Sequence, residues 1–270
     1  MSRVSPAPSV TELLTDLTAE HGDVDSIVAG IDAAAWDAAT PAEGWSVRDT
    51  ISHLAFFDEQ ATLAVRAPDE FRAGLDEWMT KPDELINGGP YRGRAMNPSD
   101  VMSWWREARA ANLAAFAAAS PGQRVPWYGP DMSVTSLITA RLMETWAHGQ
   151  DIADAVGVRR VPTARLRHIA HLGVATYRFS FVATGREAPS VPVRVELVAP
   201  DGSNWTYGPA DAENRVTGSA LGFCLLVTQR RHLDDTDVRA VGAVASEWLS
   251  FAQAFAGPAG SGRQVGLPAY

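Results

Sequence analysis

Apolar residues recur at helical spacing through the first half of the chain, from Ser9 to Gly157. Four segments there carry apolar side chains three and four positions apart, which is typical of amphipathic helices. The pattern predicts helices over residues 9–30, 46–65, 98–119 and 133–156. Ser46 with Asp49 three positions later fits a capping box, and Gly157 fits a helix end. Four helices of this kind predict a four-helix bundle.

The connection between the second and third predicted helices, from Ala67 to Asn97, is too long for a tight bundle turn. It contains Pro82, the run Gly88-Gly89-Pro90, and Arg92. These residues predict an irregular loop over the bundle, and long loops of this kind often line functional sites.

After Pro162 the pattern changes to a mixture of helices and strands. The sequence predicts helices over 164–182, 219–228 and 237–255, and strands over 191–198, 204–207 and around 216–217. The fold class is therefore mainly α with an α+β C-terminal domain. We expect a bundle over residues 9–160, a small α+β domain over 163–256, and a loosely held tail over 257–270 that is rich in Gly, Pro and Ser.

Composition and charge narrow the range of partners. With 46% hydrophobic and 20% charged residues the chain is typical of globular proteins, and its net charge of -9 disfavours nucleic acid or an anionic membrane. No stretch reaches the roughly 18 apolar residues of a membrane span, and the N-terminus carries no signal segment, which predicts a cytoplasmic protein. Cys224 is the only cysteine; it excludes an internal disulfide, and its apolar surroundings predict a buried, inert thiol.

Acidic and imidazole side chains gather on the predicted fourth helix. Glu144 and His148 are four residues apart and so share a helix face, with Asp151 three residues further on. These three lie beside the apolar stripe of their helix, and His53 holds the same place on the second helix. The polar residues beside the two apolar stripes can meet at the mouth of a bundle. There, two imidazoles and one carboxylate would hold a divalent metal with an open coordination position.

Each of these residues also has a simpler explanation. A Glu and a His four apart can be an exposed pair of little energetic weight, and a histidine near an apolar face is usually packed and hydrogen-bonded. The combination favours a metal, because a buried Glu144 would be costly unless an ion or a cationic partner neutralised it. His168 and His171 are better explained by packing, and Ser46 and Asp49 by helix capping.

The segment Gly-Trp-Ser-Val-Arg-Asp from Gly44, running through Ile-Ser-His-Leu around His53, and Glu144-x-x-x-His148-x-x-Asp151 carry a family resemblance. They resemble the metal-binding N-terminal domain of the mycothiol-dependent maleylpyruvate isomerases, within the DinB-like superfamily. The resemblance covers roughly residues 9–157 and implies a DinB-like four-helix bundle in which His53, Glu144 and His148 are zinc ligands. Asp151 matches a recurrent acidic position that would orient His148.

The C-terminal part, especially Asn204 to Tyr207 and Val216 to Arg230, is similar in outline to the small α/β domain that follows the bundle in those isomerases, and resembles sterol-carrier-like folds. In the isomerases an arginine of this domain assists substrate binding or catalysis. Arg230 and Arg231 are the nearest candidates here. The alternative is that these arginines cap the C-terminal end of a helix.

The resemblance implies a metal-dependent enzyme that activates a low-molecular-weight thiol, mycothiol, for isomerisation or S-transfer on an electrophilic small molecule. Zinc with three protein ligands keeps an exchangeable position, and coordination favours the thiolate at neutral pH. The chain has no suitably placed cysteine of its own, so the thiol would be a cosubstrate. The arginine-rich composition, with Lys81 the only lysine, agrees with an actinobacterial host that contains mycothiol.

Two other functions stay open at this point. One is a non-catalytic, metal-stabilised binding protein with a sterol-carrier-like ligand domain, and the other is a metal-dependent hydrolase that activates water. An acidic substrate would call for cationic side chains, and four arginines are available, none of them in a specific motif: Arg92, Arg94, Arg141 and Arg230. The chain can be a monomer or a homodimer.

Overall fold

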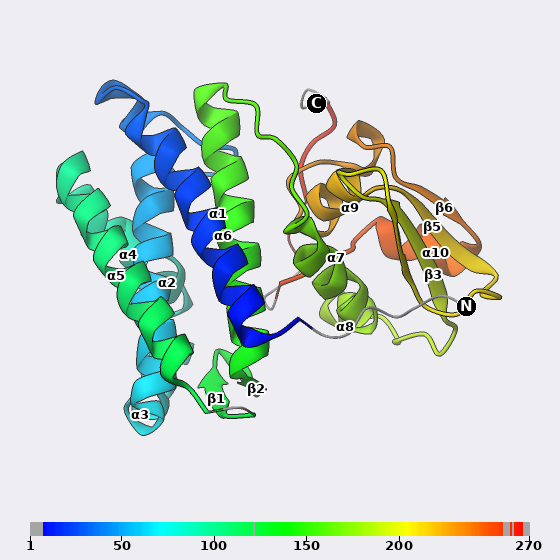
Figure 1. Cartoon of the computed structure of the whole chain (residues 1–270), viewed down its shortest axis with the longest axis horizontal. Coiled ribbons are helices and arrows are strands. Elements are labelled where there is room, and N and C mark those ends of the chain that lie inside the picture. The colour runs from blue at the N-terminus through cyan, green and yellow to red at the C-terminus, as the bar shows by residue number, and fades with distance from the viewer. Residues whose placement is uncertain (1–7, 121, 256–259, 261, 267–270) are drawn as a thin grey trace. The chain divides into compact units, whose positions relative to one another are not determined.

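The computed structural model describes residues 8–120, 122–255, 260 and 262–266. These residues form two compact units that succeed one another along the chain, the first ending at Arg160 and the second beginning at Val161. Figure 1 shows the first unit as a set of long helices and the second as a small sheet with helices. The fold class expected from the sequence, mainly α with a C-terminal α+β part, is confirmed.

The helices of the first unit are α1 (Val10–Ala29), η1 (Ala34–Asp37, a 3-10 helix), α2 (Val47–Arg66), α3 (Pro68–Thr80), α4 (Pro82–Arg94), α5 (Pro98–Ala118) and α6 (Val134–Val156). Helix α2 packs against α5 and α6, and α1 packs against the same two helices, which closes a four-helix bundle (Figure 1). Its core consists of fully buried apolar side chains from all four helices, among them Leu13, Leu17, Ile51, Leu54, Trp105, Phe116, Ile138 and Leu142.

The predicted bundle helices are confirmed close to their expected ends. The Ser46 hydroxyl accepts a hydrogen bond from the Asp49 amide (3.2 Å), and the Asp49 carboxylate accepts one from the Ser46 amide (2.9 Å), so the capping box is present. Gly157 ends α6 in the left-handed region, with φ of 68°. Local sequence therefore sets where the helices that carry the candidate site begin and end.

The connection from Ala67 to Asn97 is not the irregular loop that we expected, because it folds into α3 and α4. Pro82 lies at the first turn of α4, where its missing N–H costs nothing. The glycines serve close packing: a Cβ on Gly89 would lie 2.6 Å from the Ser52 carbonyl oxygen and 2.8 Å from Cβ of Phe56, and one on Gly93 would collide with the Ser52 side chain. Helix α4 can therefore lie directly on α2.

A short hairpin that the sequence pattern did not predict precedes α6. It consists of β1 (Arg124–Trp127) and β2 (Gly129–Ser133), which pair antiparallel with an irregularity between Val125 and Trp127. The hairpin contacts α2, α3 and α6. It therefore presents its aromatic residues to the end of the bundle where α2 finishes and α6 starts.

The elements of the second unit are α7 (Leu166–Ala175), α8 (Tyr177–Ala183), β3 (Val193–Val198), β4 (Asn204–Tyr207), β5 (Asn214–Ser219), α9 (Ala220–Val227), η2 (Leu233–Asp235), β6 (Arg239–Val241) and α10 (Ala243–Leu249). The strand order in the sheet is β4-β3-β5-β6, with β3 and β5 parallel and the outer pairs antiparallel. Helix α9 packs on β3 and β5 and against α7.

Two helix predictions in this unit were wrong. The helix expected over 164–182 is broken at Thr176 into α7 and α8, where the Thr176 hydroxyl donates to the Gln253 carbonyl (2.7 Å). The helix expected over 237–255 is instead strand β6 followed by the shorter α10. Gly242, at φ of 93°, turns the chain there, and the Asn214 side-chain oxygen accepts from the first amides of α10. These interactions join distant residues, so a local pattern does not contain them.

No helix in the described part of the chain is long and apolar enough to cross a membrane. The prediction of a loose tail over 257–270 falls mainly on residues 257–259, 261 and 267–270, which lie outside the described residues.

Candidate metal centre

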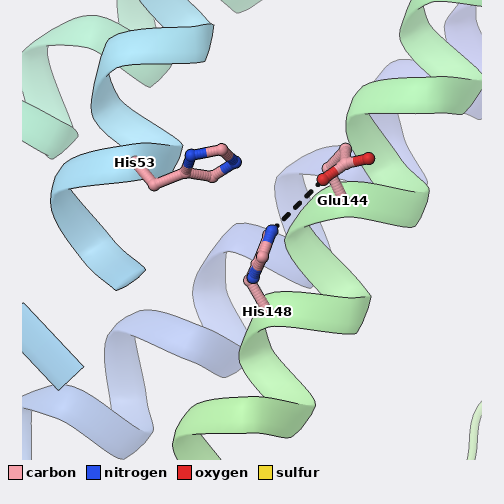
Figure 2. A group of neighbouring side chains, drawn as sticks. All are labelled: His53, Glu144 and His148. Atoms are coloured by element: carbon pink, nitrogen blue, oxygen red, sulfur yellow. Dashed lines mark ion pairs between the residues drawn. The ribbon is translucent and has the colours of Figure 1, made fainter. Parts of the chain in front are cut away.

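His53 on α2 faces Glu144 and His148 on α6, although these residues lie far apart in the sequence (Figure 2). One candidate ligand atom from each, a ring nitrogen or a carboxylate oxygen, lies within 4.8 Å of the other two. Among the described residues this is the one group of three or more His, Cys, Asp or Glu side chains with such a spacing. The structure thus brings together the three residues that the sequence singled out; we call them the triad.

His148 lies between two carboxylates. Its Nδ1 donates to Oδ2 of Asp151 at 3.2 Å, because a carboxylate can only accept, and its Nε2 lies 3.3 Å from Oε2 of Glu144. In a neutral imidazole, Nε2 then carries the lone pair and faces a second acceptor. Two acceptors at this distance need a proton or a cation to bridge them. The arrangement fits a metal ion bound by Nε2 of His148 and by Glu144, with Asp151 fixing the ring.

His53 is held by the backbone of α4. Its Nδ1 lies 3.4 Å from the carbonyl oxygen of Ile86, and a carbonyl oxygen can only accept. Nδ1 therefore carries the hydrogen and Nε2 keeps its lone pair. Both imidazoles of the triad thus have one nitrogen occupied by the protein and the other suited to bind a cation.

Electrostatics keeps two triad residues, His53 and Glu144, in the protonation states that a metal requires. Burial lowers the pKa of His53 well below its usual value, and the neighbouring charge of His148 lowers it further, so His53 is neutral at pH 7. Burial alone would raise the pKa of Glu144, but its hydrogen bond to His148 and the charges of His148 and Arg141 lower it to about 2. Glu144 is therefore ionised. A neutral His53 and an ionised Glu144 are in the forms that bind a divalent metal.

Aromatic rings surround the triad on two sides. The Trp45 ring lies 4.6 Å from the His53 ring and stacks on His148 at 5.7 Å, measured between centroids. Phe57, one turn further along α2, also lies 4.6 Å from the His53 ring. Trp45 comes from the loop before α2, so the motif around Gly44 supplies a ring as well as a helix cap. The rings limit access of water to the imidazoles.

The arginines proposed as cationic clamps in the first unit already have carboxylate partners. Arg92 pairs with Glu59 at 3.1 Å, and Arg94 with Asp49 at 2.8 Å. Arg141 is buried against Asp58 at 3.0 Å. A surface pocket of about 640 Å³ is lined by Arg94 and Asp49 together with the paired Arg48 and Asp37, and no triad residue borders it.

The remaining predicted residues lie in the second unit. The Arg230 guanidinium donates to the Thr228 carbonyl (2.7 Å), and the buried Arg231 donates to the Arg230 carbonyl (2.7 Å), just beyond α9. These bonds suit the helix-capping alternative, and a role of either residue in substrate binding stays a prediction. Cys224 is fully buried, and burial raises the pKa of its thiol, as expected for an inert side chain.

Sequence reasoning missed several residues around the site. The Ile86 carbonyl lies in α4, within the segment taken for a loop. Trp127 and Tyr128 lie in the unpredicted hairpin. The buried Asp58 could have been found from its position in the sequence. It lies five residues after His53 on α2, and Arg141 lies three residues before Glu144 on α6. Both positions are therefore displaced from the triad toward the hairpin end of the bundle.

Two segments of the chain match models of known protein families. Residues 17–153 match the family model described as the mycothiol maleylpyruvate isomerase N-terminal domain, and residues 189–241 match a model described as wyosine base formation. Two uncharacterized proteins of Mycobacterium tuberculosis, from strains H37Rv and CDC 1551, are each 46% identical over 262 residues, which cover 96% of this chain and 99% of the relative.

Solved structures show the same fold. Two crystal structures of a mycothiol-dependent maleylpyruvate isomerase, one of them of a histidine-to-alanine mutant, superpose with TM-scores of 0.58 and 0.59. Their sequence identities to this chain are 20% and 18%, and each alignment covers 89% of this chain and 95% of the other.

Fold and triad together define a helical-bundle protein with two histidines and one carboxylate at a candidate metal centre. The chain belongs to the family of the mycothiol maleylpyruvate isomerase N-terminal domain, which confirms the resemblance inferred from the sequence.

Proposed function

We propose that this protein is a metal-dependent enzyme that binds zinc through His53, Glu144 and His148 and activates mycothiol for isomerisation or S-transfer on an electrophilic small molecule. The observation that carries the proposal is the convergence of the triad. Two imidazoles, each with its Nδ1 held by the protein, and one ionised carboxylate meet with no cationic side chain among them. Such a set leaves an ion with at least one exchangeable position.

A bound zinc ion would supply Lewis acidity, which lowers the pKa of a coordinated thiol and so gives a nucleophile at neutral pH. The chain's own residues prepare the site for it. Asp151 and the Ile86 carbonyl hold the two rings in one orientation, while Trp45 and Phe57 keep water from the rings. The only cysteine of the chain is buried with a raised pKa, so the thiol has to arrive as a cosubstrate.

The position of Asp151 bears on the non-catalytic alternative, in which Asp151 would close the site as a fourth ligand. Its carboxylate contacts Nδ1 of His148, whereas Glu144 contacts Nε2 of the same ring. These nitrogens lie on opposite sides of the imidazole. The contact therefore supports an orienting role for Asp151 and an open coordination position. We further propose a cytoplasmic protein that acts as a monomer or homodimer.

Metal analysis tests the proposal directly. Wild-type protein purified without chelators should retain close to one zinc per chain, and His53→Ala should lose most of it, since one of three ligands is gone. His171→Ala is the matched control, because His171 is an exposed histidine of the second unit and should leave the zinc content unchanged. A wild-type protein without stoichiometric zinc, nickel or iron would contradict the metal centre.

A cobalt-substituted protein tests the thiol. Addition of mycothiol should change the visible spectrum of the cobalt, because a sulfur ligand replaces a solvent molecule. An unchanged spectrum together with turnover in the absence of any added thiol would instead support the hydrolase.

A further inference from the structure

The side chains around the triad are aromatic, whereas an acidic substrate with two carboxylates would require cationic side chains. Four half-buried aromatic side chains, Trp45, Phe57, Trp127 and Tyr128, lie next to the triad or in ring contact with one another, and we call them the aromatic wall. We infer that the electrophile accepted by this site carries an apolar ring that packs on the aromatic wall, instead of carboxylates held by ion pairs. The inference rests on the proposed function and names its substrate class.

The aromatic wall continues directly from the metal ligands. Phe57 lies 4.6 Å from the His53 ring, and Phe57 is in turn 5.7 Å from Tyr128 and 6.3 Å from Trp127. These centroid separations fall in the range of favourable ring contacts. A substrate group that is bonded to the metal-activated thiol and is one ring long would therefore reach from the triad to the hairpin.

The hairpin part of the wall is held firmly in place. Trp127 stacks on the buried Phe71 of α3, with centroids 5.7 Å apart and an angle of 9° between the planes. The Tyr128 hydroxyl donates to Oε1 of Gln60 on α2 at 3.2 Å. Rings that are fixed before the ligand arrives lose little entropy on binding, which favours their use as a binding surface.

The wall also carries no charge. Burial raises the pKa of Tyr128, so its phenol is neutral at pH 7. A zinc ion at the triad would be balanced by the two carboxylates of Glu144 and Asp151, both of which contact the His148 ring. No surplus positive charge then remains to bind two substrate carboxylates.

The arginines predicted as cationic clamps in the first unit do not supply that charge either. Arg141, which acts electrostatically on both His53 and Glu144, is 2% exposed and bonded to Asp58. Arg92 and Arg94 bind Glu59 and Asp49. Recruiting any of them would leave a carboxylate without its partner, at a cost that opposes binding.

The test compares two small probes on zinc-loaded protein by isothermal titration calorimetry. One is 4-phenylbutan-2-one, a neutral aryl ketone without an electrophilic double bond, and the other is maleate. We expect the aryl ketone to bind at least tenfold more tightly than maleate. Trp127→Leu should weaken ketone binding by about threefold to tenfold, the size of one aromatic contact. Tyr91→Leu is the matched control, because Tyr91 is an exposed aromatic whose contacts, Asp83 and Arg94, lie outside the wall.

Zinc content and the thermal midpoint of unfolding, measured for each variant, distinguish a lost contact from a lost fold. If the hairpin does not fold without Trp127, the variant Phe57→Leu replaces Trp127→Leu. Equal or tighter binding of maleate overturns the inference, and loss of maleate binding in Arg230→Ala would assign the carboxylate to that arginine. Unchanged ketone affinity in both wall variants overturns it as well. A protein that holds zinc and responds to mycothiol yet prefers maleate keeps the proposed function and loses only the substrate class.

Discussion

Helices α2 and α6 enclose two buried polar groups that differ in what neutralises them. In the triad, Glu144 faces imidazoles, and its side chain is 28% exposed. About one turn nearer the hairpin, the Asp58 carboxylate accepts hydrogen bonds from Nε and Nη2 of Arg141 at 3.1 and 3.0 Å, with the two side chains 1% and 2% exposed. The Asp58 carboxylate is thus paired with a guanidinium, whereas Glu144 contacts an imidazole.

This difference separates a candidate site from structural charge. A carboxylate with its own guanidinium is neutralised within the fold, and Arg141 also donates to the Leu54 carbonyl at 3.3 Å. Glu144 instead contacts the imidazole of His148 at 3.3 Å. The Asp58–Arg141 pair therefore helps to hold α2 against α6, and the triad between the same helices stays ready for a cation.

The interior around the pair contains a further titratable group, His21 of α1. It is 2% exposed, and neither ring nitrogen has a hydrogen-bond partner among the residues described. The positive charge of Arg141 acts on His21 as well as on the triad. The charge of Arg141 thus affects His21, His53 and Glu144, and the following variants separate these effects.

The largest effect is expected from breaking the pair. Arg141→Met leaves Asp58 buried without its partner and should lower the free energy of unfolding by about 3–5 kcal/mol. The double variant Asp58→Leu/Arg141→Met should recover most of this loss, because no charge is then buried alone. Urea unfolding measures both.

Arg106→Met is the control for Arg141→Met. Arg106 also pairs with an aspartate, Asp25, but its side chain is 50% exposed, so the loss should stay below about 1 kcal/mol. Equal losses in the two single variants would show that the buried pair is no more important than a surface pair.

His21 should make the bundle sensitive to acid. Burial, aided by the charges of Arg109 and Arg141, lowers the pKa of His21 from 6.5 to about 3. The unfolded chain then binds a proton that the folded chain does not, so the stabilising effect is present above pH 6.5 and is lost as the pH falls toward 3. The loss should reach a few kcal/mol at the acid end.

Unfolding of metal-free protein measured between pH 4.5 and 6.5 checks this prediction. His21→Leu should flatten the dependence of stability on pH, and His53, whose pKa is lowered in the same direction, contributes to what remains. His171→Leu, at an exposed position, should leave the slope unchanged. A slope that survives His21→Leu in full would contradict the assignment.

The bundle was predictable because its signals are local. Helix caps such as Ser46 and Gly157 and the apolar stripes reside within single segments, and they placed four helices correctly. Helices α3 and α4 were not predictable in this way. Gly89 and Gly93 look like helix breakers until α2 is known to lie against them, where any larger side chain would collide.

The candidate site was predictable only as far as its motif extends. The spacing of Glu144, His148 and Asp151 and the motif around His53 indicated the triad before the structure brought it together. The partners that complete it come from α4 and the β1–β2 hairpin, as with the Ile86 carbonyl. Which backbone atom meets which imidazole depends on how these elements pack, and no local pattern encodes that.

The smallest effect is expected from a change at Asp151, which contacts His148 of the triad. Asp151→Asn keeps the size of the side chain but removes the charge that accepts from Nδ1 of His148. The imidazole becomes a weaker and less well oriented ligand, so zinc affinity should fall by about 10–100-fold. Competition with a chelator measures the change. Asp154→Asn, on the same helix and bonded to Gln150 (2.8 Å), should leave the affinity unchanged. Equal affinities in wild type and Asp151→Asn would mean that Glu144 and the two imidazoles hold the ion without support, and that Asp151, like Asp58, only stabilises the fold.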